Sequence, residues 1–305
     1  MIENNPFTSD IFKKIWCAQF LKHKSSLSFN FITTIAFYKP TFLSLYINIG
    51  KNLTKGISYV LNADEAIKDF KNKVYLIYDV PNYFNLTTSI KQKRLGLLKV
   101  KQYPGFGVQL ENFTDLKNYL ATTFSKSSLQ KLNRYQRRLE QCFDIDYKMF
   151  YGAIEKVEYD HIFEHFKFLL TKRFDDKQIT NNNLDPAEWE FYKEVVYPLI
   201  LEKKASLYVI YNKQTPISIR LSYYNDNISF DAITTFDIDY AKFHLGKISI
   251  LKILEWSFEK ELKFFDFSKG YFDYKESWGT IKYDFEYHIY YDKKSFAATV
   301  LANSI

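Results

Sequence analysis

The sequence predicts a mixed α/β fold whose sheet is mostly antiparallel. Runs rich in Phe, Tyr and Ile alternate with segments whose apolar residues recur at helical spacing. Short polar turns separate three consecutive strand-like runs at 206–211, 216–224 and 228–236, which is the pattern of an antiparallel meander. A helical segment at 247–263 then leads to a strand at 264–267. Such a crossover makes the strands at 228–236 and 264–267 parallel, and we expect the other pairs to be antiparallel.

The first half of the chain predicts helices and strands in alternation. A helix is expected from about residue 11 to 21, with Ser9 or Asp10 as its cap. The elements expected after it are strands at 29–38 and 41–49, separated by Lys39-Pro40, then a strand at 57–61, a helix at 63–72 and a strand at 73–79.

A basic helical segment follows at 114–141, with a cap in 125–128. Three of the six arginines in this lysine-rich chain lie on it: Arg134, Arg137 and Arg138. Arginine suits bidentate contact with phosphate or carboxylate. The alternative interpretation is a solvated helix face that pairs with Glu140 and its neighbours.

The second half predicts a strand at 143–151 and two long helices at 159–174 and 186–203, the latter opened by Asp185-Pro186. After the meander come a loop at 237–244, the helix and short strand of the crossover, a helical turn at 271–278 and a last strand at 283–291. We place the domain boundary so that residues 1–155 form one lobe and 156–305 the other.

Composition excludes several classes of protein. With 305 residues, 47% of them apolar, and only 9 Gly, 7 Pro and 2 Cys, the chain is not disordered, collagen-like or a disulfide scaffold. The lysine and aromatic excess is what an AT-rich genome produces. The net charge of +7 attracts anionic partners, but it does not choose among nucleic acid, a membrane surface and a phosphorylated cofactor.

The chain ends and the cysteines predict a cytoplasmic protein. No apolar signal segment opens the sequence, and no run is long enough to span a membrane. Cys17 and Cys142 have no paired spacing and are expected to be reduced. A peripheral position at the inner face of the membrane stays open. The histidines and cysteines show no metal-ligand spacing, and no GxSxG, Walker A or GxGxxG motif occurs.

The turn before the helix at 247–263 is the best candidate for an anion site. Its residues are His244, Leu245, Gly246, Lys247 and Ile248. A helix N-terminus presents unpaired N–H groups and the positive end of the helix dipole, Gly246 permits close approach of a ligand, and Lys247 adds charge. A plain junction between loop and helix is the structural alternative.

The pieces that flank this turn carry a family resemblance. They are Phe236-Asp237-Ile238-Asp239-Tyr240, Leu245-Gly246, Phe265-Asp266-Phe267, Gly270, Tyr274-Lys275 and Trp278-Gly279. Through them the stretch 206–291 resembles the GNAT acyltransferase fold, in the branch that contains the CelD/BcsL-like and FemAB-like proteins. Leu245 stands where that branch usually has proline. Residues 5–20 are similar to the branch's opening segment, and 125–139 to its arginine-leucine helix.

The resemblance implies two tandem GNAT-like lobes, the first divergent and the second carrying the site. In GNAT proteins the two parallel strands splay apart, the pantetheine arm of acyl-CoA lies in the opening, and the pyrophosphate rests on the helix N-terminus, here 244–248. No metal is implied. The acceptor attacks the thioester directly, without a covalent enzyme intermediate.

The resemblance also implies roles for side chains. Asp231 is a candidate base, with Asp237 and Asp239 as alternatives, and Tyr271 or Tyr274 would protonate the leaving thiolate. The residues expected to bind substrate are Asp237, Asp239, Tyr240, Asp266, Gly270 and Lys275. Each also has a structural interpretation, as a solvated strand residue, a cap or a packed tyrosine.

The function expected is acyl-CoA-dependent transfer to an amine, or a hydroxyl, of a small-molecule, glycan or lipid precursor. One alternative is a FemAB-like transferase that uses aminoacyl-tRNA and acts on a peptidoglycan precursor. Another is a binding module with a GNAT fold and no catalysis. DNA is not an expected partner.

Overall fold

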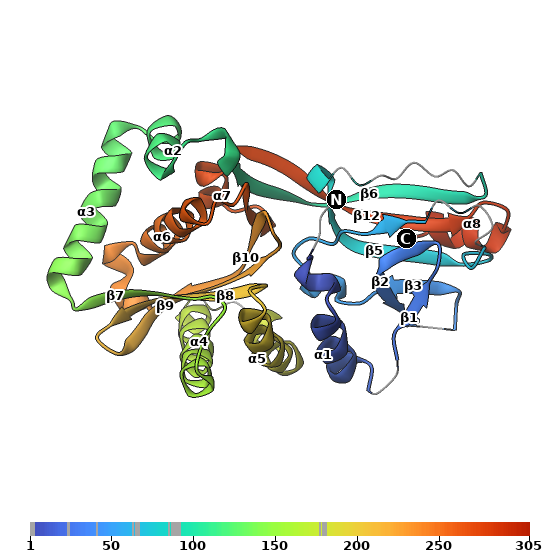
Figure 1. Ribbon diagram of the computed structural model, residues 1–305, viewed down its shortest axis with the longest axis horizontal. Helices are drawn as coiled ribbons and strands as arrows, with labels where there is room; N and C mark the ends of the chain where they lie inside the picture. Colours follow the sequence, from blue (N-terminus) through green and yellow to red (C-terminus); the bar gives the residue numbers. More distant parts are fainter. Residues whose placement is uncertain are drawn as a thin grey trace. The chain divides into compact units, whose positions relative to one another are not determined.

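The computed structural model describes residues 4–22, 25–40, 42–62, 64, 68–84, 86, 93–176, 178 and 182–305. The chain divides into two compact units (Figure 1). Unit 1 consists of Met1–Phe106, Ser268–Asp273 and Lys282–Ile305, and unit 2 of Gly107–Phe267 and Tyr274–Ile281. These units are discontinuous because the chain returns to unit 1 at its end, whereas the predicted division at residue 155 is continuous. That division stays a prediction.

Unit 1 is a sheet with two short helices. Its strands follow the order β1-β2-β3-β5-β12, with β4 also paired to β2. The elements are η1 (Pro6–Thr8), α1 (Asp10–Phe20), β1 (Leu27–Phe29), β2 (Ile32–Tyr38), β3 (Leu45–Asn48), η2 (Lys51–Leu53), β4 (Val60–Leu61), β5 (Val74–Pro81), η3 (Asn82–Phe84), most of β12 (Ile281–Asp292) and α8 (Phe296–Asn303). The long strand β6 (Leu95–Gln109) begins in unit 1 and ends in unit 2.

The structure of this half differs from the expectations in three places. β3 and β5 are parallel, with Leu45 opposite Val74, and not antiparallel as expected, because the long connection between them acts as a crossover. The strand β6 and the helix α8 were not predicted. The helix expected at 63–72 lies partly outside the described residues, and 69–72 form turns. Helix α1 is confirmed, with Ser9 as its cap.

Unit 2 has its strands in the order β11-β10-β9-β8-β7. Helices α4 and α5 lie on one face of this sheet and α6 on the other (Figure 1). The elements are η4 (Leu110–Asn112), α2 (Leu116–Thr123), α3 (Lys126–Cys142), β7 (Ile145–Phe150), α4 (Lys156–Asp176), η5 (Asn182–Leu184), α5 (Pro186–Leu201), β8 (Ala205–Asn212), β9 (Thr215–Tyr224), β10 (Ile228–Phe236), η6 (Ile238–Phe243), α6 (Leu245–Glu259), β11 (Phe264–Lys269) and α7 (Asp273–Trp278).

Most sequence signals of unit 2 are confirmed, but the helical segment expected at 114–141 is broken into α2 and α3, and the helix expected at 247–263 spans Leu245–Glu259. β8, β9 and β10 form the antiparallel meander, and β10 pairs with β11 in parallel. Asp185 caps α5 through the N–H groups of residues 187 and 188, and Ser125 caps α3. The strands β8 and β9 are buried along almost their whole length because helices cover both faces.

Candidate functional site

Strands β10 and β11 pair only where they begin. Their register runs over three residue pairs, from Ile228 opposite Phe264 to Phe230 opposite Asp266. β10 then continues to Phe236 and β11 to Lys269 without further pairing to each other. Two parallel strands that part in this way leave main-chain groups available at the point of divergence. This is the splayed pair that the sequence predicted.

A buried ion pair marks the point of divergence. Asp231 is the first residue of β10 beyond the paired segment, and the ladder between β10 and β9 shifts register between Asp231 and Ile233. A bulge of this kind re-aims a side chain. Oδ2 of Asp231 lies 2.6 Å from Nη1 of Arg220, and the two side chains are 6% and 2% exposed. Nε of Arg220 donates to the hydroxyl of Ser249 on α6, at 3.1 Å.

Lys275 belongs to the same polar cluster. It lies on α7 and is 5% exposed, although a lysine is rarely buried without a reason. Burial lowers the pKa of its ammonium to about 8, and the nearby carboxylates of Asp231 and Asp266 oppose that shift. Asp266 is fully buried on β11. The structure therefore brings together three of the predicted site residues in the interior of unit 2.

The two candidate tyrosines differ in their surroundings. Tyr274, in unit 2, is 41% exposed as a whole residue, yet burial, followed by the charge of Asp231, raises the pKa of its hydroxyl to about 12. It stays protonated at neutral pH and can act as a proton donor. Tyr271 belongs to unit 1, where its exposed ring contacts Phe106 edge-on. Gly270, also in unit 1, has φ +95° and donates its N–H to the carbonyl of Pro104.

The predicted anion turn forms the N-terminus of α6. His244 precedes the helix in the left-handed conformation, with φ 55°, and its side chain makes no capping hydrogen bond. Leu245 and Ile248 are buried, so only their main chain can face a ligand, whereas His244 and Lys247 are exposed. Burial, Lys247 and Arg138 together lower the pKa of the imidazole, in that order of size. The local field is thus positive, as an anion site requires.

The arginine helix α3 packs beside this turn. The ring of Tyr135 lies 3.9 Å from that of His244, centroid to centroid, and the guanidinium of Arg138 lies 5.9 Å from the ring of Phe243. Arg134, Arg137 and Arg138 are all exposed. The three arginines that the sequence singled out therefore add to the positive charge around the start of α6.

The remaining predicted residues hold the loop between β10 and α6. Nζ of Lys172, on α4, lies 2.6 Å from Asp237 and 2.7 Å from Asp239, and these two contacts raise the pKa of the lysine. The hydroxyl of Tyr240 accepts a hydrogen bond from Asn212. Contacts of this kind, which hold a loop in place, are typical of structural residues. Binding of substrate by Asp237, Asp239 and Tyr240 stays a prediction.

Two arginines of the site were missed from the sequence. Arg220 pairs with Asp231, and Arg173, on α4, donates to the carbonyl of Thr234 and lies over the ring of Phe236 at 4.5 Å. Burial lowers the pKa of Arg173, which Tyr274 partly offsets. Arginine is rare in this chain, which has 6 arginines and 36 lysines, so the sequence could have singled out Arg173 and Arg220 as candidates.

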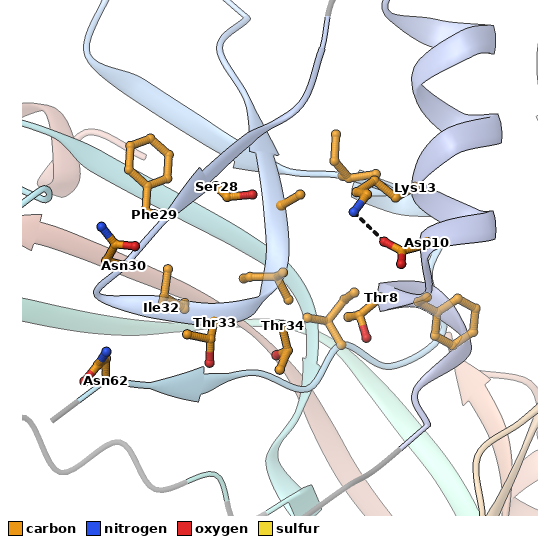
Figure 2. Close-up of a pocket in the computed structure, with 15 residues that line it drawn as sticks. Thr8, Asp10, Lys13, Ser28, Phe29, Asn30, Ile32, Thr33, Thr34 and Asn62 are labelled. Carbon is orange, nitrogen blue, oxygen red and sulfur yellow. Dashed lines mark hydrogen bonds and ion pairs between the residues drawn. The ribbon is translucent and has the colours of Figure 1, made fainter.

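A separate cavity lies in unit 1. It has a volume of about 440 Å³ and is bordered by η1, α1, β1 and β2 (Figure 2). Polar side chains surround it, among them Thr8, Ser28, Asn30 and Thr33, and an ion pair between Asp10 and Lys13 closes one side. None of the residues predicted to carry chemistry lines this cavity.

The described part of the chain shows neither a metal cluster nor a membrane-spanning helix. Within it, no three side chains of His, Cys, Asp or Glu are grouped so that they could hold a metal ion. Nor does any helix in the described ranges have the length and apolar character needed to cross a bilayer.

Comparisons with known proteins agree with this geometry. Residues 126–276, from the start of α3 into α7, match the family model of the acetyltransferase (GNAT) domain. This segment contains β10, β11, the α6 N-terminus and the cluster of Asp231, Arg220 and Lys275. No curated protein matches the sequence.

Solved structures share the fold at low sequence identity. FemX is similar over 89% of this chain and 86% of its own, with a TM-score of 0.59 and 10% identity. A conserved protein of unknown function from Bacteroides thetaiotaomicron covers 95% and 92%, with a TM-score of 0.58 and 11% identity. The C-terminal domain of a putative lysylphosphatidylglycerol synthetase from Agrobacterium fabrum covers 88% and 84%, at 0.53 and 12%. The fold of this chain is therefore GNAT-like; the CelD/BcsL-like branch is not distinguished from the others.

Proposed function

We propose that the chain is an acyltransferase that moves an acyl group from the thioester of acyl-CoA to an amine. The observation that carries the proposal is the divergence of β10 and β11 beside the N-terminus of α6, with a buried polar cluster at the fork. The match of residues 126–276 to the acetyltransferase domain supports it. The acceptor proposed is a small molecule, or a glycan or lipid precursor, with a hydroxyl as the alternative nucleophile.

The donor would bind through main-chain groups. The N–H groups at the start of α6 and the side chain of Lys247 would hold the pyrophosphate, since the first turn of a helix has unpaired donors and a positive field. The pantetheine arm would lie where β10 and β11 part, and the edge of β10 beyond Phe230 would supply N–H donors to the thioester oxygen.

The chemistry would be a direct displacement. The neutral amine attacks the thioester carbon, the C–N bond forms, and the C–S bond breaks as the tetrahedral intermediate collapses. Asp231 takes the proton of the acceptor nitrogen, directly or through water, and Tyr274 gives its proton to the leaving thiolate. All three carboxylates have a cationic partner, and Asp231 is favoured because it lies at the fork of β10 and β11 beside Tyr274 and Lys275, whereas Lys172 holds Asp237 and Asp239 in the loop before α6. Tyr274 is favoured over Tyr271 because it shares unit 2 with Asp231.

Gly246→Asp tests donor binding. The substitution places a carboxylate at the proposed pyrophosphate site, and we expect calorimetry to show that acetyl-CoA binding weakens by about a hundredfold or more. Gly246→Ala is the matched control, because its Cβ meets Phe236 at the same 3.3 Å but adds no charge. Equal affinity of the aspartate and alanine variants would refute the anion site. Release of free CoA thiol from acetyl-CoA with an amine acceptor tests transfer itself, and its absence for every acceptor would favour a binding module without catalysis.

A second donor class has one specific observation in its favour. The exposed arginines of α3 lie next to the same helix N-terminus, and the similarity to FemX fits a FemAB-like transferase that uses aminoacyl-tRNA. Salt distinguishes the two donors. The affinity for tRNA would fall steeply with ionic strength because many counterions are released, while the affinity for CoA would fall only modestly.

A further inference from the structure

Helix α8 of unit 1 buries two small residues and exposes two large apolar ones. Its small residues Ala298 and Ala302 are 4% and 1% exposed and pack against β3, β5 and β12. Two of its large apolar residues, Phe296 and Val300, are 86% and 52% exposed, while a third, Leu301, packs against the same core. A surface helix ordinarily buries its large apolar residues and exposes polar ones. The outer face of α8 is therefore an apolar surface without a partner in the described chain.

A second exposed apolar segment lies at the same end of unit 1. Phe42 and Leu43 are 92% and 43% exposed and precede β3, which begins at Leu45. Leu45 is opposite Val74 on β5, and Val74 is opposite Tyr291, near the end of β12 and close to the start of α8. Leu45 also packs against the cluster that holds the alanines of α8. Phe42 and Phe296 thus project from one end of the sheet.

Exposed lysines also lie at this end of the sheet. The N–H of Lys293 donates to the carbonyl of Arg94, and that of Asp292 to the carbonyl of Lys73, so the starts of β5 and β6 meet the end of β12. The exposed lysines near this junction are Lys71, Lys93, Lys293 and Lys294, and no ion pair of theirs occurs among the described residues. Asp292 is neutralised by Arg94, and the carboxylate of Asp69 accepts the main-chain N–H groups of Asn30 and Phe31. This end of unit 1 therefore carries an excess of positive charge.

We propose that this end of unit 1, formed by Phe42, Leu43, the outer face of α8 and the four lysines, binds the surface of an anionic lipid bilayer. Exposed aromatic side chains flanked by lysines suit the interface, where the rings enter the boundary between headgroups and acyl chains while the ammonium groups meet lipid phosphates. The inference is independent of the proposed transferase activity.

Vesicle co-sedimentation of the full chain tests the proposal. We expect binding to phosphatidylcholine vesicles that contain phosphatidylglycerol, weak binding to phosphatidylcholine alone, and loss of binding as salt rises. The double variant Lys294→Gln/Phe296→Ser should bind about fiftyfold more weakly, from about fivefold for the lysine and about tenfold for the ring.

The matched control is Lys167→Gln/Phe168→Ser on α4, where a lysine and a phenylalanine that is 58% exposed lie side by side in unit 2. Control and wild type should bind equally, and all three proteins should unfold at the same temperature because the replaced side chains are exposed. Absence of binding to anionic vesicles, or equal loss in both variants, would overturn the proposal. A dimer in buffer that only Lys294→Gln/Phe296→Ser dissociates would assign this surface to a second copy of the chain instead.

Discussion

Among the described residues, each unit contains an arginine–aspartate pair with a buried carboxylate, and the two pairs are built differently. In unit 1, Arg94 binds Asp292 through two nitrogens, and the same carboxylate accepts N–H groups from Asn72 and Lys294. In unit 2, Oδ2 of Asp231 lies 2.6 Å from Nη1 of Arg220, Oδ1 accepts a hydrogen bond from the hydroxyl of Thr234, and both members of the ion pair are buried.

The difference separates a structural pair from a candidate functional one. Every acceptor site of Asp292 is used, and its hydrogen bond with Arg94 is the main reason why its pKa falls to about 2. Asp231 instead shares its surroundings with Tyr274 and Lys275, whose pKa values are both displaced. Clusters of interacting titratable groups at a fork between strands are typical of functional sites, whereas a saturated pair is typical of a link between segments. Four experiments test this contrast.

The largest effect should come from the pair in unit 2. Asp231→Ala leaves Arg220 buried without its partner, so we expect a loss of about 3–5 kcal/mol in unfolding free energy and of about a thousandfold in transfer rate. The double variant Arg220→Met/Asp231→Leu removes both charges and should recover most of the stability but none of the activity. Urea unfolding and thiol release measure the two effects, and an active double variant would contradict the assignment.

Lys275→Met should change how stability depends on pH. The pKa of Lys275 in the folded protein is about 8, below its value of about 10.4 in an unfolded chain. Between these values the unfolded state binds more protons, so the free energy of unfolding of the wild type gains on the order of 3 kcal/mol as pH rises. The methionine variant should lack this gain. Parallel curves for the two proteins from pH 7.5 to about 10.4 would show that the buried ammonium is not destabilising.

Asp292→Ala should destabilise the protein without altering catalysis. Loss of hydrogen bonds to a charged group costs about 1.5–3 kcal/mol, and the rate of transfer per folded molecule should stay unchanged. The wild-type carboxylate contributes stability above its ordinary pKa and loses that contribution as pH falls toward about 2. Acid titrations of both proteins should therefore converge near pH 2, and a variant with reduced turnover would remove the contrast between the pairs.

The smallest effect is expected for Lys172→Met. The lysine holds Asp237 and Asp239, but the second carboxylate is 70% exposed, so the pairs contribute about 1 kcal/mol or less. If they only order the loop before α6, the KM for the donor should rise a few-fold while kcat is kept. A large fall in kcat at unchanged KM would instead indicate that one of these carboxylates is the base.

Unit 2 was more predictable from the sequence than unit 1, for a physical reason. The meander of β8, β9 and β10 is made of neighbours in sequence joined by tight turns, and the caps Ser125 and Asp185 act on their own helices. Such signals are local. In unit 1, β5 pairs with β3 and with β12. Val74 of β5 lies opposite Tyr291 of β12, and these two residues are more than two hundred positions apart in the chain. Periodicity carries no information about pairing at that distance.

The same difference between local and long-range contacts applies to the candidate site. The glycine and lysine at a helix start predicted the anion turn at 244–248, and the family resemblance nominated Asp231; both assignments stay predictions. The partner of Asp231 could not be read, since Arg220 joins it across β9 and β10, and α7 brings Lys275 from further along the chain.

The amino-acid order thus determined most elements of unit 2, their caps and the crossover that makes β10 and β11 parallel, because each depends on contacts between near neighbours. Only the tertiary structure decided where those strands stop pairing, which charges are buried together, and that α8 turns its phenylalanine outward. These properties depend on which distant surfaces exclude water from one another, and burial is a property of the packed chain rather than of any single segment.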